Sequence, residues 1–432
     1  MGSSGLLKRE ISLFGAVTYG VGMIVGAGIY ALIGIGAGQA GNSIWLSFIL
    51  AAIIAASTGL SYAELSSIFP MSSAEYMYVK KAFGRDFPAF IIGWLVLASG
   101  IISASTVAIG FGGYLTSYIN IPESLATIFI IIMVTFVNLV GVRDTVRLNA
   151  VMTIIEVLGL VIIIFFGIRF WGSVNYFEAP MGVNGIVTAA ALIFFAFIGF
   201  ESIAKIGEET RDPAKTLPRA VILSLIISTL LFVLVSISVV SIMPYDKLSV
   251  STAPLTDVVL IAQGEQAASV MSVIALIATS NTLLIIMTAT SRIAYGMAKE
   301  QSLPTIVARV LPRRGTPWVA ILLVTVTSIP FALIADIDIV ANVTTLMLFL
   351  VFIAINLSLI VLSRNNRNDN HGFKTPFRIG NIPVTAVIGA ISSFLMLLQF
   401  QIPVVLITLI SILIGASIYV IYRRRKLSNQ KA

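Results

Sequence analysis

Long apolar runs recur along the whole chain and constrain its fold more than any other feature of the sequence. About twelve runs of roughly 20 residues are separated by short polar segments. A helix of about 20 apolar residues spans a hydrocarbon layer of roughly 30 Å, and it satisfies its own backbone hydrogen bonds in lipid. The runs are continuous rather than alternating, which disfavours a transmembrane barrel. The sequence therefore predicts an all-α integral membrane protein with about twelve transmembrane helices.

These runs leave no room for a separate soluble domain. Charged residues make up 11% of the chain, against roughly 25% in soluble domains. The longest polar segments, 299–316 and 364–382, are short enough to be loops. We therefore expect one transmembrane domain over residues 1–432. The expected spans are residues 12–38, 43–69, 88–118, 123–141, 148–170, 184–206, 218–243, 268–296, 317–335, 340–363, 383–400 and 402–422.

Basic residues are distributed unevenly between the two sides that this topology creates. With a cytoplasmic N-terminus, 25 of the 27 lysine and arginine residues fall in cytoplasmic segments, and only Arg169 and Lys247 do not. Cytoplasmic loops of membrane proteins carry an excess of lysine and arginine. We therefore expect both termini in the cytoplasm and the protein in the plasma membrane. The same distribution explains the net charge of +8 without a nucleic-acid partner.

The residue types present exclude several kinds of chemistry. The chain has no cysteine, and its single histidine, His371, lies in a polar segment. Disulfides, thiol chemistry and a metal centre built from histidine and cysteine are therefore excluded. We expect no metal and no cofactor, and no serine–histidine pair lies at membrane depth to support a membrane enzyme. A channel is the second rival class, and it would need a continuous pore lined by charges or carbonyls.

Two of the expected spans carry signals that interrupt a helix. The first span contains four glycines within residues 20–28, and each glycine in a helix interior costs about 1 kcal/mol relative to alanine. The sixth span contains Gly199 near its centre. Close helix packing is an alternative explanation for Gly22 and Gly26, which form a GxxxG pair.

The two interruptions lie five spans apart, so the two helices cross the membrane in opposite directions. Two inverted repeats, approximately residues 12–170 and 184–363, with appended helices at 383–422, would give this arrangement. In transporters of this kind, the unwound segments meet near the bilayer midplane and form the substrate site. Amides at a helix N-terminus bind a carboxylate, and carbonyls at a helix C-terminus attract an ammonium group. A zwitterionic amino acid presents both groups, so the pattern favours an amino acid carrier.

Short motifs in the spans and loops resemble those of one transporter superfamily. They are Gly26-Ala27-Gly28-Ile29, Tyr62-Ala63-Glu64-Leu65 with Pro70, Tyr76-Met77-Tyr78, Phe197-Ile198-Gly199-Phe200-Glu201, Glu208-Glu209 through Pro218-Arg219, and Ser291-Arg292 through Leu303-Pro304. On these residues the chain resembles the amino acid–polyamine–organocation (APC) superfamily over nearly its whole length. Ser73 and Ala74 stand where the family motif has two glycines.

This resemblance implies a LeuT-like fold, with broken helices 1 and 6 in a 5+5 inverted repeat followed by two further helices. It also implies a substrate site at the two breaks. The expected substrate-binding residues are Ile24, Gly26, Ala27, Gly28, Phe195, Ile198 and Gly199. The amides of Ala27 and Gly28 are implied to bind the substrate carboxylate. The carbonyls of Ile24, Phe195 and Ile198 are implied to bind its ammonium group.

Phe195 has a second implied role, as a gate. It matches the aromatic residue that covers the substrate in a related arginine–agmatine exchanger, where that residue is a tryptophan. Plain core packing is the alternative explanation for a phenylalanine at this position.

Glu156 is an isolated acid in the apolar span 148–170. An ionisable residue inside a membrane is a functional candidate by default. Proton-coupled relatives resemble this segment but carry a lysine there, so the glutamate is a departure from their pattern. Because burial disfavours the charged form of a carboxylate, one interpretation is that Glu156 couples transport to protons. The alternatives are a structural ion pair with Lys205 or another base, and a ligand for a cation such as sodium.

Three other charged residues have simpler explanations. Glu64 lies near the cytoplasmic end of its span, where we expect a helix-end anchor or gate partner rather than a substrate ligand. Glu201 and Lys205 are four residues apart in one span, so an ion pair between them is the default expectation.

Side-chain specificity depends on residues outside the breaks. Ser103, Asn281 and Thr344 are candidates for the side-chain pocket, and no acid is evident near it, which disfavours arginine, lysine and polyamines. We therefore expect a secondary active permease in membrane lipid, coupled to protons or alternatively to sodium, which takes up small or neutral amino acids by alternating access. The alternatives are an amino acid/amine exchanger, a carrier of cationic amino acids or polyamines, and, from other classes, a channel or membrane enzyme.

Overall fold

The computed structural model describes residues 11–70, 74–140, 145–311, 316–334, 336–364 and 372–429, without the side chains of 145–148, 208–209 and 423–429. Some residues used above therefore lie outside the described part of the chain. They are Ser73, His371 and seven of the basic residues counted as cytoplasmic, namely Lys8, Arg9, Arg143, Arg313, Arg314, Arg367 and Lys431.

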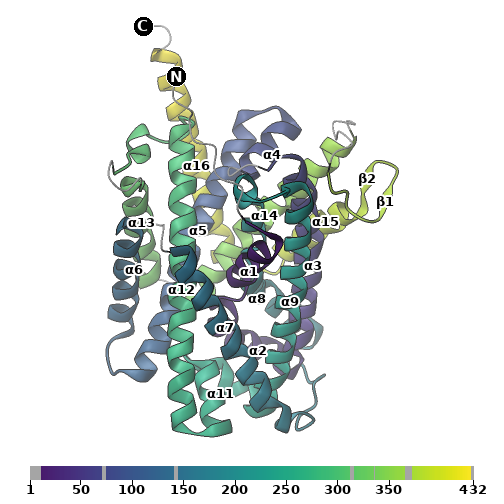
Figure 1. The fold of residues 1–432 in the computed structure, drawn as a ribbon, viewed down its shortest axis with the longest axis vertical. Helices are drawn as coiled ribbons and strands as arrows, with labels where there is room; N and C mark the ends of the chain where they lie inside the picture. Colours follow the sequence, from purple (N-terminus) through teal and green to yellow (C-terminus); the bar gives the residue numbers. More distant parts are fainter. Residues whose placement is uncertain are drawn as a thin grey trace.

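The molecule is an elongated bundle of long helices (Figure 1). The long helices are α1 (Leu13–Ile24), α2 (Ala27–Ala40), α3 (Ile44–Ile68), α5 (Asp86–Tyr118), α6 (Glu123–Val140), α7 (Thr145–Gly167), α8 (Gly182–Ile193), α9 (Pro213–Ile242), α12 (Glu265–Lys299), α13 (Trp318–Ile334), α14 (Ile337–Arg364), α15 (Val384–Leu397) and α16 (Ile402–Asn429). Within the described ranges, nine helical segments are long and apolar enough to cross a membrane. The predicted all-α membrane protein is confirmed.

Each expected span coincides with one long helix or with a pair of half-helices. The first span is divided between α1 and α2, and the sixth between α8 and two 3₁₀ segments, η3 (Phe194–Phe197) and η4 (Phe200–Glu209). Two further 3₁₀ turns follow spans, η1 (Gly41–Ser43) after the first and η2 (Ile168–Phe170) after the fifth. Apolar length is a local property of the sequence, so it locates the spans to within a few residues.

Several short elements were not expected from the sequence. They are α4 (Ala74–Phe83), α10 (Tyr245–Val250), α11 (Pro254–Gln263), η5 (Thr305–Ala308) and an antiparallel hairpin of β1 (Arg378–Ile379) and β2 (Ile382–Pro383). In Figure 1, α4 and the hairpin lie toward one end of the bundle and α11 lies at the other. Because these elements are shorter than a membrane span, apolar run length alone does not reveal them.

Helix α4 carries basic residues at the end of the bundle that it shares with the hairpin. Lys80 forms an ion pair of 3.2 Å with Asp86 at the start of α5. The hydrogen bond that Lys80 donates to this carboxylate raises the pKa of Lys80 above its usual value. The lysine therefore stays positively charged at neutral pH.

Aromatic side chains fill the core between α3, α14 and the sixth span. Tyr62 contacts Phe200 edge-on at a ring-centroid distance of 5.9 Å and Phe352 at 6.1 Å. Phe194 contacts Phe349 at 4.6 Å. Edge-to-face and tilted pairs at these distances are favourable arrangements of aromatic rings. This cluster supports the segment that carries the second helix interruption.

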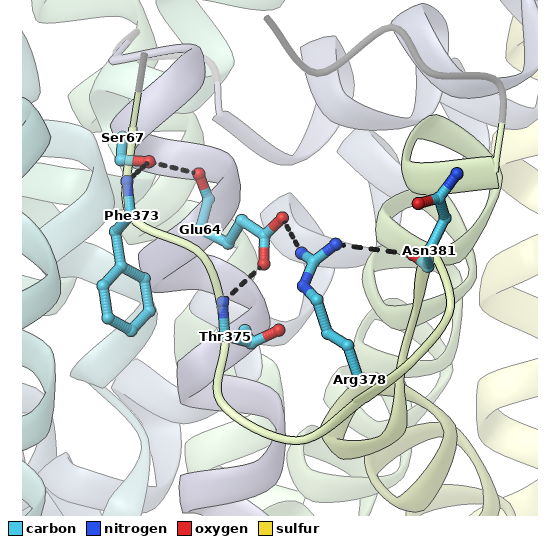
Figure 2. A network of polar contacts seen from close by, with 6 residues as sticks. All are labelled: Glu64, Ser67, Phe373, Thr375, Arg378 and Asn381. Atoms are coloured by element: carbon cyan, nitrogen blue, oxygen red, sulfur yellow. Dashed lines mark hydrogen bonds and ion pairs between the residues drawn. The ribbon is translucent and has the colours of Figure 1, made fainter. Parts of the chain in front are cut away.

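A polar network attaches the segment before α15 to the end of α3 (Figure 2). The buried carboxylate of Glu64 accepts a hydrogen bond from the Thr375 amide (2.8 Å) and forms an ion pair with Arg378. The Phe373 amide donates to Ser67 Oγ (3.0 Å), and the Ser67 hydroxyl donates to the Glu64 carbonyl (2.7 Å). The expectation of an anchor at the end of α3 is therefore met by residues more than 300 positions away in the sequence.

Candidate functional site

The first helix interruption separates α1 from α2 at Val25 and Gly26. The Val25 amide still donates to the Val21 carbonyl (2.6 Å), but the Gly26 amide turns back to the Ile24 carbonyl (2.9 Å). Gly26 is extended, and a new helix starts at Ala27. The first amides of a helix have no acceptor within that helix. The interruption therefore places free helix N–H groups in the interior of the protein.

The second interruption lies between η3 and η4. The Ile198 amide donates to the Phe195 carbonyl (3.2 Å), and Gly199 then adopts φ +129°. Only glycine populates this backbone region readily. Glu201 folds back so that its Oε2 accepts a hydrogen bond from the Gly199 amide (2.8 Å). Glu201, which was expected to pair with Lys205, thus caps the start of η4.

The two interruptions pack directly against each other. A Cβ added to Gly28 would lie 2.5 Å from the Cα of Ala196 in η3, and a Cβ added to Gly199 would lie 2.6 Å from the Met23 carbonyl oxygen. Each break therefore needs a glycine because the backbone of the other break occupies the space that a side chain would fill.

A cavity lies where the breaks meet, and all seven expected binding residues line it. Its walls also include one face of α5 and one face of α12, with two residues of α14. The lining residues are Gly22, Met23, Ile24, Gly26, Ala27, Gly28, Val96, Ser99, Gly100, Ser103, Phe195, Ala196, Ile198, Gly199, Glu201, Ser202, Lys205, Thr282, Ile285, Ile286, Ala289, Thr290, Ile293, Thr344 and Leu348.

Two of the three candidates for the side-chain pocket, Ser103 and Thr344, line this cavity, and Asn281 does not. Asn281 points instead toward α7, where its amide donates to Glu156 Oε1 (2.9 Å). The expectation that no acid lies near the pocket was also wrong, because Glu201 is part of the wall. Backbone reversal at Gly199 turns the start of η4 toward the cavity, which a continuous helix would not do.

Thr282 is a wall residue that the sequence did not single out. Its Oγ1 accepts a hydrogen bond from the Ala27 amide (3.0 Å), and its hydroxyl donates to the Ala278 carbonyl (2.9 Å). One of the two amides expected at the carboxylate site is thus already bonded. Among the residues that the structure describes, the Gly28 amide donates to no acceptor outside its own helix. A threonine within an apolar helix gives no local sign of this contact.

The expected ion pair between Glu201 and Lys205 is replaced by a different one. Lys205 bonds Glu75 of α4 at 3.1 Å, with both side chains largely buried. The segment that carries Glu201 and Lys205 is a 3₁₀ helix, in which residues three apart, not four, are aligned on one face. Lys205 is therefore available to a residue from another helix.

Glu156 lies outside the cavity, in a separate buried cluster between α2, α7 and α12. Its side chain is fully buried, and its Oε1 accepts the hydrogen bond from Asn281. Asn281 also donates to Asn149 Oδ1 (3.0 Å), and the Tyr30 hydroxyl donates to the Glu156 carbonyl (2.7 Å). The proposed pair with Lys205 is excluded in this structure, because Lys205 bonds Glu75.

A multi-pass helical protein with two interrupted helices around a buried cavity has the features of a membrane carrier. The sequence matches the profile of the amino acid permease family over residues 11–422. The chain belongs to this family, which lies within the APC superfamily, so it is a transporter rather than an enzyme.

The names of individual relatives refer to different substrates. The chain is 29% identical over 441 residues to the branched-chain amino acid permease BcaP of Bacillus subtilis (strain 168), covering 97% of this chain and 94% of the relative. It is 28% identical to the methylthioribose transporter of the same organism, and the match covers 97% of this chain and 94% of the relative. It is 27% identical to the vacuolar cationic amino acid transporter 4 of Arabidopsis thaliana, over 82% of this chain and 63% of the relative.

Proposed function

We propose that this protein carries small or neutral amino acids across the plasma membrane by alternating access. The observation that carries the proposal is the contact between the two helix interruptions at one buried cavity. The cavity is thus lined by the first residues of α2, which carry helix N-terminal amides, and by the ends of α1 and η3, which carry helix-end carbonyls. A zwitterion fits this arrangement because its two charges have opposite signs and a fixed separation.

The carboxylate site in this proposal is the start of α2. The helix dipole and the amides of the first turn favour an anion there. The Gly28 amide is directly available, while the Ala27 amide must exchange the Thr282 hydroxyl for the substrate. Thr282 would then keep its bond to the Ala278 carbonyl, and it would accept from the Ala27 amide again when the substrate leaves.

The ammonium site in this proposal consists of the carbonyls of Ile24, Phe195 and Ile198. The Ile24 carbonyl accepts one hydrogen bond from the Gly26 amide, and the Phe195 carbonyl accepts one from the Ile198 amide. Each carbonyl oxygen has a second lone pair that can accept from the ammonium group. Phe195 is 5% exposed, lines the cavity and belongs to the same apolar cluster as Ala27 and Leu283. We infer that its ring covers the substrate.

The proposed topology has twelve crossings with both termini cytoplasmic. The first of the nine long segments, Leu13–Ile68, comprises two crossings, because η1 interrupts it, and α13 and α15 supply the remaining short crossings. The hairpin, α4 and the C-terminal end of α16 lie toward the same end of the bundle (Figure 1), and that end carries Lys80 and Arg378. We propose that the first ten crossings form the 5+5 inverted repeat and that α15 and α16 are appended to it.

Proton coupling through Glu156 is part of the proposal, with sodium coupling and exchange as alternatives. Glu156 Oε2 and Asn281 Oδ1 are both buried without a hydrogen-bond partner among the described residues. A proton on Oε2 would give the carboxyl group a donor as well as an acceptor in this cluster. The cluster contacts α2, because Tyr30 bonds the Glu156 backbone. Movement of α2 between outward- and inward-open states would then alter the proton affinity.

Cationic amino acids are a second candidate substrate class, favoured by the buried Glu201 in the cavity wall. This acid already accepts bonds from the Gly199 amide and Ser202, which leaves it less able to bind a substrate cation. We therefore rank neutral amino acids first.

The experiment that tests the function is uptake of labelled compounds by purified protein in proteoliposomes. The panel contains neutral and cationic amino acids and methylthioribose, each with an imposed proton or sodium gradient. We expect saturable uptake of neutral amino acids that an inward proton gradient stimulates. Uptake of methylthioribose alone, or non-saturating flux of all solutes, would overturn the proposal. Preferred uptake of lysine or arginine would select the second substrate class.

A further inference from the structure

Buried hydroxyl groups in this helical bundle follow a common rule. Each normally donates to a backbone carbonyl three or four residues earlier in its own helix. On α5, Ser99 donates to the Val96 carbonyl (3.0 Å) and Thr106 to that of Ile102 (3.2 Å). On α14, Thr345 donates to the Ala341 carbonyl (2.9 Å). In lipid this internal bond satisfies a hydroxyl that has no water available.

Two hydroxyls of the cavity wall depart from this rule. Ser103 on α5 and Thr344 on α14 are 3% and 0% exposed, and both line the cavity. Neither side-chain oxygen has a hydrogen-bond partner within the described part of the chain. A buried polar group without a partner loses its hydration and gains nothing in return. Two such groups on one cavity indicate that a ligand supplies their missing bonds.

The two hydroxyls are presented by helices that pack against each other. Helices α5 and α14 pack against each other, and Ser103 and Thr344 both line the cavity. The apolar residues of the wall include Val96 on α5, Ile286 on α12 and Leu348 on α14. The region therefore combines a small apolar surface with two uncommitted hydroxyls. Thr282 and Ser99, which also line the cavity, already donate to backbone carbonyls.

We propose that Ser103 and Thr344 select substrates whose side chain carries a hydroxyl or amide group, and that L-threonine is preferred over its isostere L-valine. This inference rests on the proposed amino acid transport and names the side-chain class for the same site. A hydroxyl donates and accepts, as do the two wall hydroxyls. An aliphatic side chain of the same shape would leave both wall groups unpaired, which is how a polar site rejects an apolar analogue.

The test compares threonine with valine, because the two side chains differ only by a hydroxyl in place of a methyl group. The measured quantity is kcat/KM for uptake of each by proteoliposomes. In the wild-type protein we expect threonine to exceed valine by about tenfold or more, the size of one well-placed hydrogen bond. Ser103→Ala and Thr344→Val should each reduce this ratio toward one, mainly by lowering the value for threonine.

The matched control is Thr345→Val on the residue adjacent to Thr344. Thr345 is buried to the same degree but bonds the Ala341 carbonyl and does not line the cavity. This variant should keep the wild-type ratio. A second readout needs no transport. It is the increase in the Tm of the detergent-purified protein when L-threonine is added. It should shrink in the Ser103 and Thr344 variants and persist in the control.

The outcomes separate this inference from the proposed function. Uptake of valine as efficient as that of threonine, or an unchanged ratio in both cavity variants, overturns the selection by hydroxyls and leaves amino acid transport standing. A ratio that falls equally in Thr345→Val also overturns it, because the effect would then be one of packing. Absence of uptake for every amino acid in the panel overturns both proposals.

Discussion

Arg378 forms an ion pair with the fully buried carboxylate of Glu64, although 314 positions separate the two residues in the sequence. The contact closes the segment before α15 over the end of α3 (Figure 2). The Thr375 amide binds the second carboxylate oxygen at 2.8 Å. A carboxylate buried to this degree is stable only with such partners.

Removal of Arg378 is expected to destabilise the protein more than neutralisation of Glu64. Arg378→Ala leaves a buried negative charge without its cation, which typically costs about 3–5 kcal/mol. Glu64→Gln removes the charge and keeps an acceptor for the Thr375 amide. The double variant Glu64→Gln/Arg378→Ala should recover part of the loss. Thermal unfolding in detergent measures all three, and additive effects of the two single changes would contradict a direct pair.

A side chain at Gly28 is expected to abolish uptake through a backbone clash. The Cβ of alanine would meet the Cα of Ala196 at 2.5 Å, and overpacking of this kind costs about 1–3 kcal/mol or more. Gly28→Leu, which would also fill the proposed carboxylate site, should behave similarly. The control is Gly296→Ala on α12, where the added Cβ meets nothing within 4 Å. Normal uptake by a folded Gly28→Leu protein would rule out a carboxylate site at this break.

Phe195→Ala is expected to slow net transport more than it reduces the amount of folded protein. The ring lies at the cavity edge and is 5% exposed, so its loss opens the proposed substrate site without removing a polar contact. Uptake rates per unit of folded protein measure the effect. The control for core packing is Phe232→Ala, because this buried ring packs against Phe48 and Phe197 and does not line the cavity. Wild-type transport by Phe195→Ala would assign the ring to the core.

Glu156→Gln is expected to keep folding and substrate binding and to lose stimulation by an inward proton gradient. Glutamine retains an acceptor for the Asn281 amide and adds an N–H donor, so it imitates the protonated carboxyl group. Exchange of internal for external substrate should survive better than net uptake. The exposed acid Glu265 supplies the control, Glu265→Gln. Unchanged proton dependence would leave a structural role for Glu156, and loss of sodium dependence would make it part of a cation site.

The proposed topology is tested with reporters at the two faces. A fusion after Lys426 should report the cytoplasm, and a tag beside Lys247 in α10 should be accessible from outside the cell. The basic end of the bundle is expected inside because cytoplasmic segments are enriched in lysine and arginine. Labelling of the two positions on the same face would remove one crossing from the proposed count.

The sequence by itself determined the membrane spans and the two helix interruptions. Both depend on local properties, namely the length of an apolar run and the presence of glycine where a helix must turn. Gly26 and Gly199 could therefore be placed at breaks before any neighbour was known. Family motifs added the expectation that the two breaks form one site, and the seven expected residues do share a cavity.

Only the tertiary structure decided which polar groups meet. Lys205 bonds Glu75 on another helix rather than Glu201 on its own, and Asn281 bonds Glu156 instead of lining the cavity. Inside a membrane, a polar side chain needs a partner, but several candidates of equal chemistry exist along the chain. Which one it reaches depends on how helices far apart in sequence are rotated against each other, and that rotation is set by packing over the whole bundle.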